Sequence, residues 1–147
     1  MASVTPLSPT TLVREGVQRD VREASRQAKI CLEAKDIDGS RAQLDKAGAL
    51  LAAAREAWPN GWGEKQADRA LADGCHPAEI SISGLTVMAL NLESTWWWET
   101  GDLPKAAQVL KPALSESGAG NRQLAFTYSN MCAILSKVIV AQLARSP

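Results

Sequence analysis

The chain has few of the residues that build metal centres or disulfide frames. Its 147 residues include one histidine, His76, and three cysteines that lie far apart, Cys31, Cys75 and Cys132. It has no Cys-x-x-Cys or Glu-x-x-His pattern, so a zinc or di-iron centre would lack its usual ligands. An odd number of distant cysteines is typical of reduced thiols in a cytoplasmic protein. We therefore expect no metal, no cofactor and no disulfide.

An excess of charge of one sign is also absent. Sixteen lysine and arginine residues balance sixteen aspartate and glutamate residues, and both signs are mixed along the chain. No basic stripe is available for a phosphate backbone or an anionic membrane surface, which disfavours nucleic acid as a partner. The most apolar stretch, residues 124–143, is interrupted by Ser129, Asn130, Ser136, Lys137 and Gln142. Neither a membrane span nor a secretory signal is expected.

The sequence shows no arrangement typical of catalysis. No segment alternates apolar and polar residues as a strand would, so there is no Gly-rich loop after a strand to hold a nucleotide. His76 follows Cys75, but neighbouring side chains rarely face each other, and His76-Pro77 is better interpreted as a helix start. No pair of carboxylates can be placed in a cleft as acid and base. We expect no catalytic residue, and hence a protein that is not an enzyme.

What the chain does have is helical periodicity along most of its length. The pattern predicts a single all-α domain, residues 1–147, with five main helices in antiparallel hairpins. Turn and capping signals place four of these helices at residues 9–34, 76–100, 103–116 and 121–144. The remaining helix begins after Asp36 or Asp38 and ends near Trp58. Residues 1–8 form a tail, and residues 59–76 form a polar connection with room for a short helix at residues 65–72.

The last predicted helix, residues 121–144, is apolar over most of its circumference. Tyr128 and Met131 belong to one apolar stripe, while Phe126 and Ile139 belong to two others. Only a thin polar strip remains. A helix of this kind is buried either between other helices of its own chain or against a partner chain. The second alternative predicts a homo-oligomer that forms through this helix.

Two helix breaks lie in similar surroundings. Lys35-Asp36-Ile37 and Gly101-Asp102-Leu103 each precede a helix that carries small residues at matching offsets. These small residues are Ser40 and Ala47 after the first break, and Ala106 and Ala113 after the second. Small side chains at such points let two helix axes approach closely, and larger neighbours then fill the space beside them. The pattern predicts two tightly packed hairpins.

Residues 90–114 resemble the tetratricopeptide repeat, whose helix pairs stack into a concave surface that binds peptides. The positions that correspond to the family's pattern are Leu90, Glu93, Ser94, Trp97, Ala106, Leu110 and Ala113. Glu93 stands where a leucine is typical, and Gly118 replaces the proline that follows the second helix. The hairpin at residues 24–51 has a looser form of the pattern. This resemblance implies a degenerate array of two units, with a closed helical bundle as the other possible arrangement.

Residues 8–54 resemble a second family, the flagellin export chaperones, which are antiparallel helical bundles. The similarity lies in Ser8-Pro9, in Lys35-Asp36-Ile37 and in the tract Gln43-Leu44-Asp45-Lys46-Ala47-Gly48-Ala49-Leu50-Leu51. The first helix lacks that family's aromatic and leucine content, and the C-terminal helix is additional. This resemblance implies a chaperone-like role.

The tripeptide Trp96-Trp97-Trp98 is the main candidate for a binding site. Adjacent residues of a helix lie about 100° apart, so one face cannot bury three indoles. A half-exposed indole either belongs to the core without a binding role or serves as an anchor for a partner. Glu93 lies on the same helix and is either solvated or a polar contact to a bound peptide. The candidate partner-binding residues are Trp96, Trp97, Trp98, Glu93, Tyr128 and Met131.

Together these patterns predict a non-catalytic adaptor or chaperone-like domain. It would bind a peptide or helix of another protein in an apolar groove lined by Trp97, Trp98 and the last helix. The alternative is an RNA- or DNA-binding helical oligomer of the translin type, which needs basic residues to converge from several helices. A small helical enzyme whose carboxylates gather only in three dimensions is the third possibility.

Overall fold

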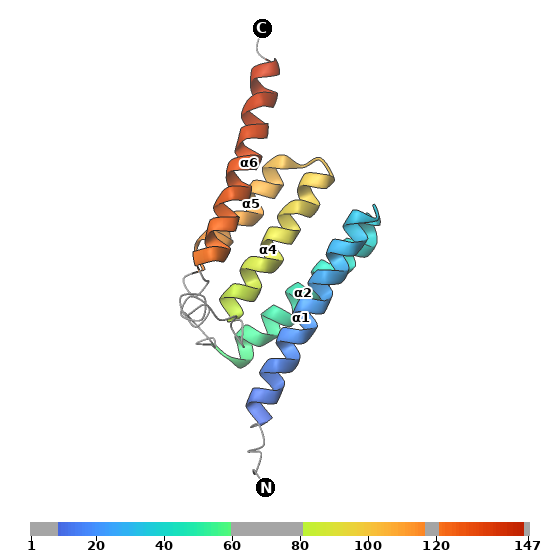
Figure 1. Cartoon of the computed structure of the whole chain (residues 1–147), viewed down its shortest axis with the longest axis vertical. Helices are drawn as coiled ribbons and strands as arrows, with labels where there is room; N and C mark the ends of the chain where they lie inside the picture. The colour runs from blue at the N-terminus through green and yellow to red at the C-terminus, as the bar shows by residue number, and fades with distance from the viewer. Residues whose placement is uncertain (1–8, 60–80, 117–120, 146–147) are drawn as a thin grey trace.

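A computed structural model describes residues 9–59, 81–116 and 121–145 of the chain. Within these residues the chain forms five helices and no strand, which confirms the all-α fold. The helices are α1 (Pro9–Glu33), α2 (Ile37–Ala57), α4 (Ile82–Glu99), α5 (Leu103–Leu114) and α6 (Asn121–Arg145). Successive helices run in alternating directions (Figure 1). The antiparallel hairpins α1–α2 and α4–α5 are those that the sequence predicts.

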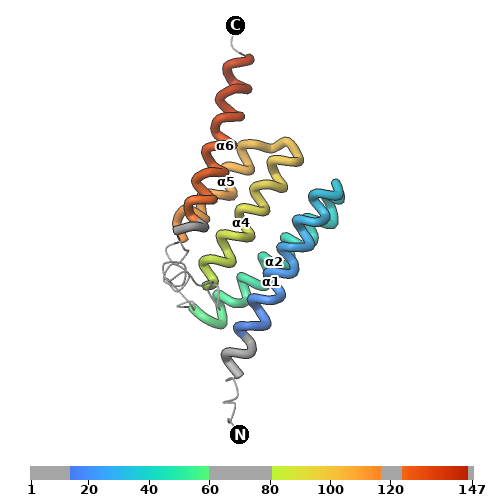
Figure 2. The backbone as a smooth tube through the Cα atoms, in the orientation of Figure 1, coloured from blue at the N-terminus to red at the C-terminus, as the bar shows by residue number. Residues whose placement is uncertain are grey.

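The helices form two layers. α1, α4 and α6 lie side by side, and α2 and α5 lie behind them (Figure 1, Figure 2). In the second layer, α2 packs against α1 and α4, while α5 packs against α4 and α6. Each helix of the second layer therefore covers the junction between two helices of the first. The C-terminal end of α6 projects beyond the other helices (Figure 2).

Both hairpins turn through the same backbone conformation. The residue before the capping aspartate has a positive φ, 64° at Lys35 and 92° at Gly101. The carboxylates of Asp36 and Asp102 each accept a hydrogen bond of 3.0 Å from the backbone N–H three residues later. These bonds satisfy amides at the starts of α2 and α5 that have no partner inside the helix. The two breaks thus share both backbone geometry and helix capping.

A buried serine hydroxyl joins the two helices of each hairpin. Ser40 Oγ donates a hydrogen bond of 2.8 Å to the Ala28 carbonyl, from α2 to α1. Ser94 Oγ donates a bond of the same length to the Ala106 carbonyl, from α4 to α5. Positions 28 and 40 each lie 66 residues before positions 94 and 106, so the serine and alanine exchange places between the hairpins. The predicted close approach at Ser40 and Ala106 is confirmed, since neither side chain is exposed.

The apolar core is divided between the two hairpins. One cluster joins α1, α2 and the start of α4 and includes Val21, Leu51 and Leu85. Another joins α5 and α6 through Leu110 and Ile134. Because α4 contributes to both clusters, it is the helix that holds the two hairpins together.

The third predicted helix begins later than the sequence pattern suggests. Ser81 has extended backbone geometry, and its hydroxyl accepts a hydrogen bond of 2.9 Å from the Gly84 amide. Because Ser81 caps the helix in this way, α4 starts at Ile82 rather than at residue 76. The proposed capping role of His76 and the short helix at residues 65–72 lie outside the described residues, as does the tail at residues 1–8.

Among the described residues, only one face of α6 packs against other helices. Thr127 and Ile134 are buried on that face. The large apolar side chains left exposed on this helix are Phe126, Tyr128, Leu135, Ile139, Val140 and Leu143. Burial inside the same chain, the first of the two predicted alternatives, is therefore wrong for most of α6. Among the described residues, α6 is the helix long and apolar enough to cross a membrane, over Leu124–Arg145, by length and composition alone.

We expect substitutions at the two turn residues, Lys35 and Gly101, to change the free energy of unfolding in opposite directions. Lys35→Gly removes a side chain from a positive φ and should raise the free energy of unfolding by about 1 kcal/mol. Gly101→Lys introduces such a side chain and should lower it by about the same amount. Urea denaturation followed by circular dichroism measures both changes. Lys35→Ala is the control, because it removes the exposed 3.8 Å ion pair with Glu99 at an unchanged φ. A loss of stability in Lys35→Gly larger than in Lys35→Ala would contradict this account.

Candidate functional site

Trp96 connects α4 to α2. Its Nε1 donates a hydrogen bond of 3.0 Å to the carbonyl of Ile37, the first residue of α2. The guanidinium of Arg41 lies over the same indole, 5.2 Å from the ring centroid. An indole N–H needs a partner when it is buried, and the helix start supplies one. Trp96 therefore supports the fold on the side of α4 that faces α2.

Trp97 is part of the core between α4 and α5. Its ring meets that of Trp96 edge to face, with centroids 4.8 Å apart and planes at 87°. It packs against the cluster that contains Ala106 and Leu110. The Nε1 of Trp97 is buried and has no hydrogen-bond partner among the residues that the structure describes. The structure therefore places Trp97 behind the predicted groove rather than on its surface, because the small Ala106 leaves room for the indole.

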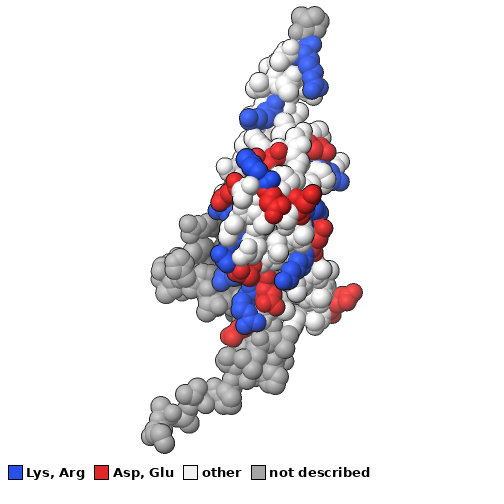
Figure 3. Space-filling model, turned by 90° about the vertical axis from the view of Figure 1, so that its right-hand side faces the viewer, with Lys and Arg blue, Asp and Glu red and all other residues white. Residues whose placement is uncertain are grey.

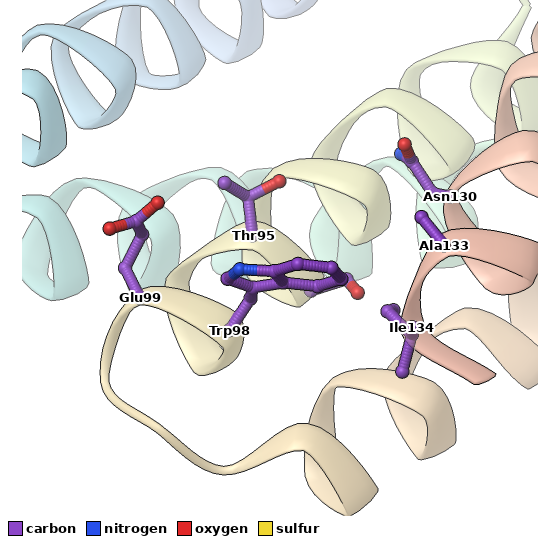
Figure 4. A pocket seen from close by; sticks show the side chains of 7 residues that line it. Thr95, Trp98, Glu99, Asn130, Ala133 and Ile134 are labelled. Carbon is purple, nitrogen blue, oxygen red and sulfur yellow. The ribbon is translucent and has the colours of Figure 1, made fainter. Parts of the chain in front are cut away.

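Trp98 forms one wall of an open pocket between α4 and α6 (Figure 4). The half-buried indole packs against the α5–α6 cluster that includes Ile134. The ammonium of Lys137 lies 5.4 Å from the centroid of the ring. The pocket has a volume of about 240 Å³, and the other lining residues are Ser94, Thr95, Glu99, Asn130, Ala133 and Ile134. Of the three indoles, that of Trp98 is thus packed against the core on one side and open to the pocket on the other.

A second hollow lies between α1 and α4. It has a volume of about 500 Å³, and it shares Thr95 and Glu99 with the Trp98 pocket. Its other lining residues are Lys29, Leu32, Glu33, Lys35, Asn91, Leu92 and Phe126. The two hollows meet over the C-terminal half of α4, and together they are named the α4 trough. The trough therefore crosses the layer of helices formed by α1, α4 and α6.

A network of polar side chains fixes α6 to α4 beside the trough. Asn91 Nδ2 donates hydrogen bonds to the Val87 carbonyl at 2.9 Å and to Thr127 Oγ1 at 2.8 Å. Asn130 Nδ2 donates a bond of 2.8 Å to Asn91 Oδ1. Asn91 and Thr127 are buried, so these bonds replace those that water would make. The distance between α4 and α6, and with it the width of the Trp98 pocket, depends on this network.

The structure separates the six residues that the sequence groups as one binding site. Of these, only Trp98 lines the α4 trough. Glu93 lies on the α2 side of α4, where its carboxylate forms an ion pair of 2.8 Å with Arg41. Met131 is half-buried against the α5–α6 cluster, and Tyr128 is 55% exposed on α6 and lines neither hollow. The helical period of α4 explains part of the separation, because positions 93, 96 and 97 share one side of the helix, near Arg41, whereas position 98 lies about 100° away from position 97.

Glu93 belongs to a third hollow, of about 410 Å³, between α2 and α4. Its ion pair with Arg41 connects the two helices, and a second ion pair, Arg55–Glu116 at 2.6 Å, connects α2 to the residues after α5. Both arginines line this hollow. Neither interpretation of Glu93 from the sequence foresees this role, which is to join two helices rather than to face water or a peptide.

Several trough residues are not among the candidates drawn from the sequence. They are Thr95, Leu92, Phe126, Asn130 and Ala133. One signal was available for α4: Asn91, Thr95 and Glu99 are four residues apart and hence share a face with Trp98. No comparable signal exists for Ala133, because an alanine on an apolar helix is consistent with any environment.

Among the residues that the structure describes, no group of three or more histidine, cysteine, aspartate or glutamate side chains is placed to hold a metal ion. Fold and site together define an all-α protein of antiparallel helical hairpins with an open trough on one layer. Comparison of the chain with protein-family models, with curated proteins and with solved structures finds no match.

We expect Asn91→Ala to lower the free energy of unfolding by about 2 kcal/mol, because it removes the buried bonds between α4 and α6. Asn130→Ala removes only the outer bond and should cost about half as much. Chemical denaturation gives both values, and amide hydrogen exchange shows whether α6 loses protection before α1 and α2. A smaller effect from Asn91→Ala than from Asn130→Ala would show that the network does not hold α6 in place.

Proposed function

We propose that this chain is a non-catalytic binding domain that holds a short apolar segment of another protein in the α4 trough. The observation that carries the proposal is the position of Trp98, which packs on the core and lines an open pocket. Tryptophan is among the residues that contribute most to protein–protein affinity, and such anchors lie in well-packed hollows. An indole that the core already holds in place loses little conformational entropy when a ligand covers it.

The division of the trough into two hollows supports a peptide as the ligand. The Trp98 pocket, at about 240 Å³, lies below the roughly 300–1,000 Å³ of most small-molecule sites, while the larger hollow lies within that range. A pocket of this size suits a single apolar side chain. The larger hollow, about 500 Å³, lies on the other side of Thr95 and suits the residues next to that side chain. A segment that crosses α4 at Thr95 would fill both hollows.

The charges around the trough support a polypeptide rather than a nucleic acid. The larger hollow is lined by two lysines and two glutamates, Lys29, Lys35, Glu33 and Glu99. Acidic and basic side chains also alternate over the body of the molecule on the face in Figure 3. A phosphate backbone needs a run of basic groups, whereas a peptide with mixed flanking charges meets both signs favourably.

We also propose that the helices stack as tetratricopeptide-like units rather than close into a bundle. The identical caps of α2 and α5, and the matching serine–alanine contacts, support two equivalent hairpins. In this arrangement α1, α4 and α6 are the first helices of successive units. The trough then lies on the surface that these first helices share, which is where the resemblance implies a peptide site.

Filling the Trp98 pocket tests the proposal without removing the tryptophan. Peptides are first selected from a displayed random library with the unaltered chain. Ala133→Phe places a ring in the pocket and should weaken binding of these peptides at least about tenfold, because the anchor side chain loses its space. Fluorescence anisotropy of labelled peptides measures the dissociation constants.

The matched control is Ala53→Phe, the same change at an exposed position of α2 that lines none of the three hollows. It should leave the dissociation constants unchanged. Bound peptide should also shift the indole N–H signal of Trp98 in a nitrogen–proton NMR spectrum, assigned with Trp98→Phe. Selected peptides that bind Ala133→Phe as tightly as the unaltered chain would overturn the proposal.

A further inference from the structure

An apolar stripe follows the outer side of α6, away from the bundle. It consists of Tyr128, Cys132, Leu135, Ile139 and Leu143, which are separated by four, three, four and four residues. The four large side chains are between 47% and 68% exposed, and Cys132 is exposed as well. This spacing keeps the five residues on one side of the helix. The stripe is named the α6 seam.

The face of α6 that packs on the chain lies opposite the seam. Thr127 and Ile134 are buried there, and Lys137 extends over the Trp98 ring. Neither hollow of the α4 trough includes a seam residue. The seam is thus a second surface, distinct from the trough.

The seam carries no charge. α6 contains no acidic residue, and its basic residues are Arg122, Lys137 and Arg145. Lys137 lies on the side of the helix opposite the seam, and Arg145 lies in the last turn. Figure 3 shows basic but no acidic side chains among the uncharged ones on the projecting end of the molecule, in contrast to the mixed charges of the body. A partner selected by charge would find no complementary group along the stripe, whereas an identical stripe meets no repulsion.

The spacing and length of the seam fit a helix-to-helix contact. Apolar residues that recur every three or four positions are the pattern by which two helices pack along a common line, and the seam residues recur in this way. With roughly 100 Å² exposed at each of the five seam side chains, a symmetric pair of seams would bury at most about 1,000 Å². That area is at the lower limit for a specific interface between two copies.

We infer that the α6 seam binds the α6 seam of a second copy of this chain. The two helices pack side by side, with Leu135 and Ile139 at the centre of the contact. The bundle of each copy lies on the far side of its own α6, so the bundles do not compete for the seam. The trough stays open in the dimer, because its lining residues on α6, such as Ala133, lie off the seam.

A lipid bilayer is the other environment that would cover an apolar face. Crossing a membrane would require Thr127, Asn130 and Lys137 to leave their partners on α4, since all three lie on the packed side of this helix. Of the basic side chains that the structure describes on α6, Lys137 lies over Trp98 on the packed side, so Arg145 alone is near the seam to attach it to anionic headgroups. The uncharged stripe therefore favours a copy of itself.

Sedimentation equilibrium over a range of concentrations, in reducing buffer, tests the inference. The unaltered chain should show a reversible equilibrium between monomer and dimer. Leu135→Glu and Ile139→Glu each place a carboxylate in the centre of the contact and should weaken the dimer at least about 100-fold. Both positions are exposed in the single chain, so both variants should keep their helical circular dichroism.

The matched control is Val140→Glu. Val140 is 64% exposed on the same helix but lies about 100° around it from Ile139, off the seam. It should leave the dimer unchanged, because its carboxylate stays in water. A chain that is monomeric at its highest soluble concentration would overturn the inference. So would a dimer that Val140→Glu weakens as much as Leu135→Glu.

Vesicles of mixed neutral and anionic phospholipid provide a further check. The dimer should not sediment with them. If the chain is monomeric and vesicle binding is lost in Leu135→Glu, the seam meets lipid and the inference is overturned. Ala133→Phe should leave dimerisation intact, which separates this test from that of the proposed peptide site.

Discussion

The close contact between the two helices of each hairpin is the constraint on which the rest of the structure depends. At each contact a serine hydroxyl donates a hydrogen bond of 2.8 Å to a carbonyl of the opposite helix, at Ala28 in one hairpin and Ala106 in the other. Such a bond needs the helix backbones to be near each other, so any side chain between them must be small. A bulkier residue at either position would separate the helices and move the capped turn as well.

The position of α4 between its neighbours determines the surroundings of each of the three tryptophans. α4 packs against α2 and α5 in the second layer and lies between α1 and α6 in the first. Three consecutive residues on such a helix therefore face three different neighbours. Trp96 bonds to the start of α2, and Trp97 fills the space against Ala106. Trp98 points toward α6, and the space left between these two helices is the pocket (Figure 4).

α6 has two apolar surfaces because it is packed on one face alone. On one side it contributes Phe126 and Ala133 to the α4 trough. On the other it carries the α6 seam, centred on Leu135 and Ile139. The polar contacts of Asn130 and Lys137 hold the helix between these two surfaces. The same packing that opens the trough thus leaves the seam exposed, which is why we propose a separate partner for each.

The sequence by itself determined the all-α class, the two hairpins, their capping aspartates and the small residues at their contacts. These features follow from local rules, because a cap or a helical period involves residues only a few positions apart. The late start of α4 at Ile82 was less evident, since Ser81 competes with an earlier capping pattern. Even so, the boundaries of α2 and α5 follow closely from the sequence.

Only the tertiary structure decided which apolar surfaces are covered. The pattern of α6 is apolar nearly all round, and nothing in it distinguishes the buried Ile134 from the exposed Leu135. Likewise, the carboxylate of Glu93 meets Arg41 from a helix 52 positions away. Both outcomes depend on where helices distant in sequence come to lie, and local periodicity does not contain that information. The trough at Trp98 arises in the same way, from the spacing of α1, α4 and α6.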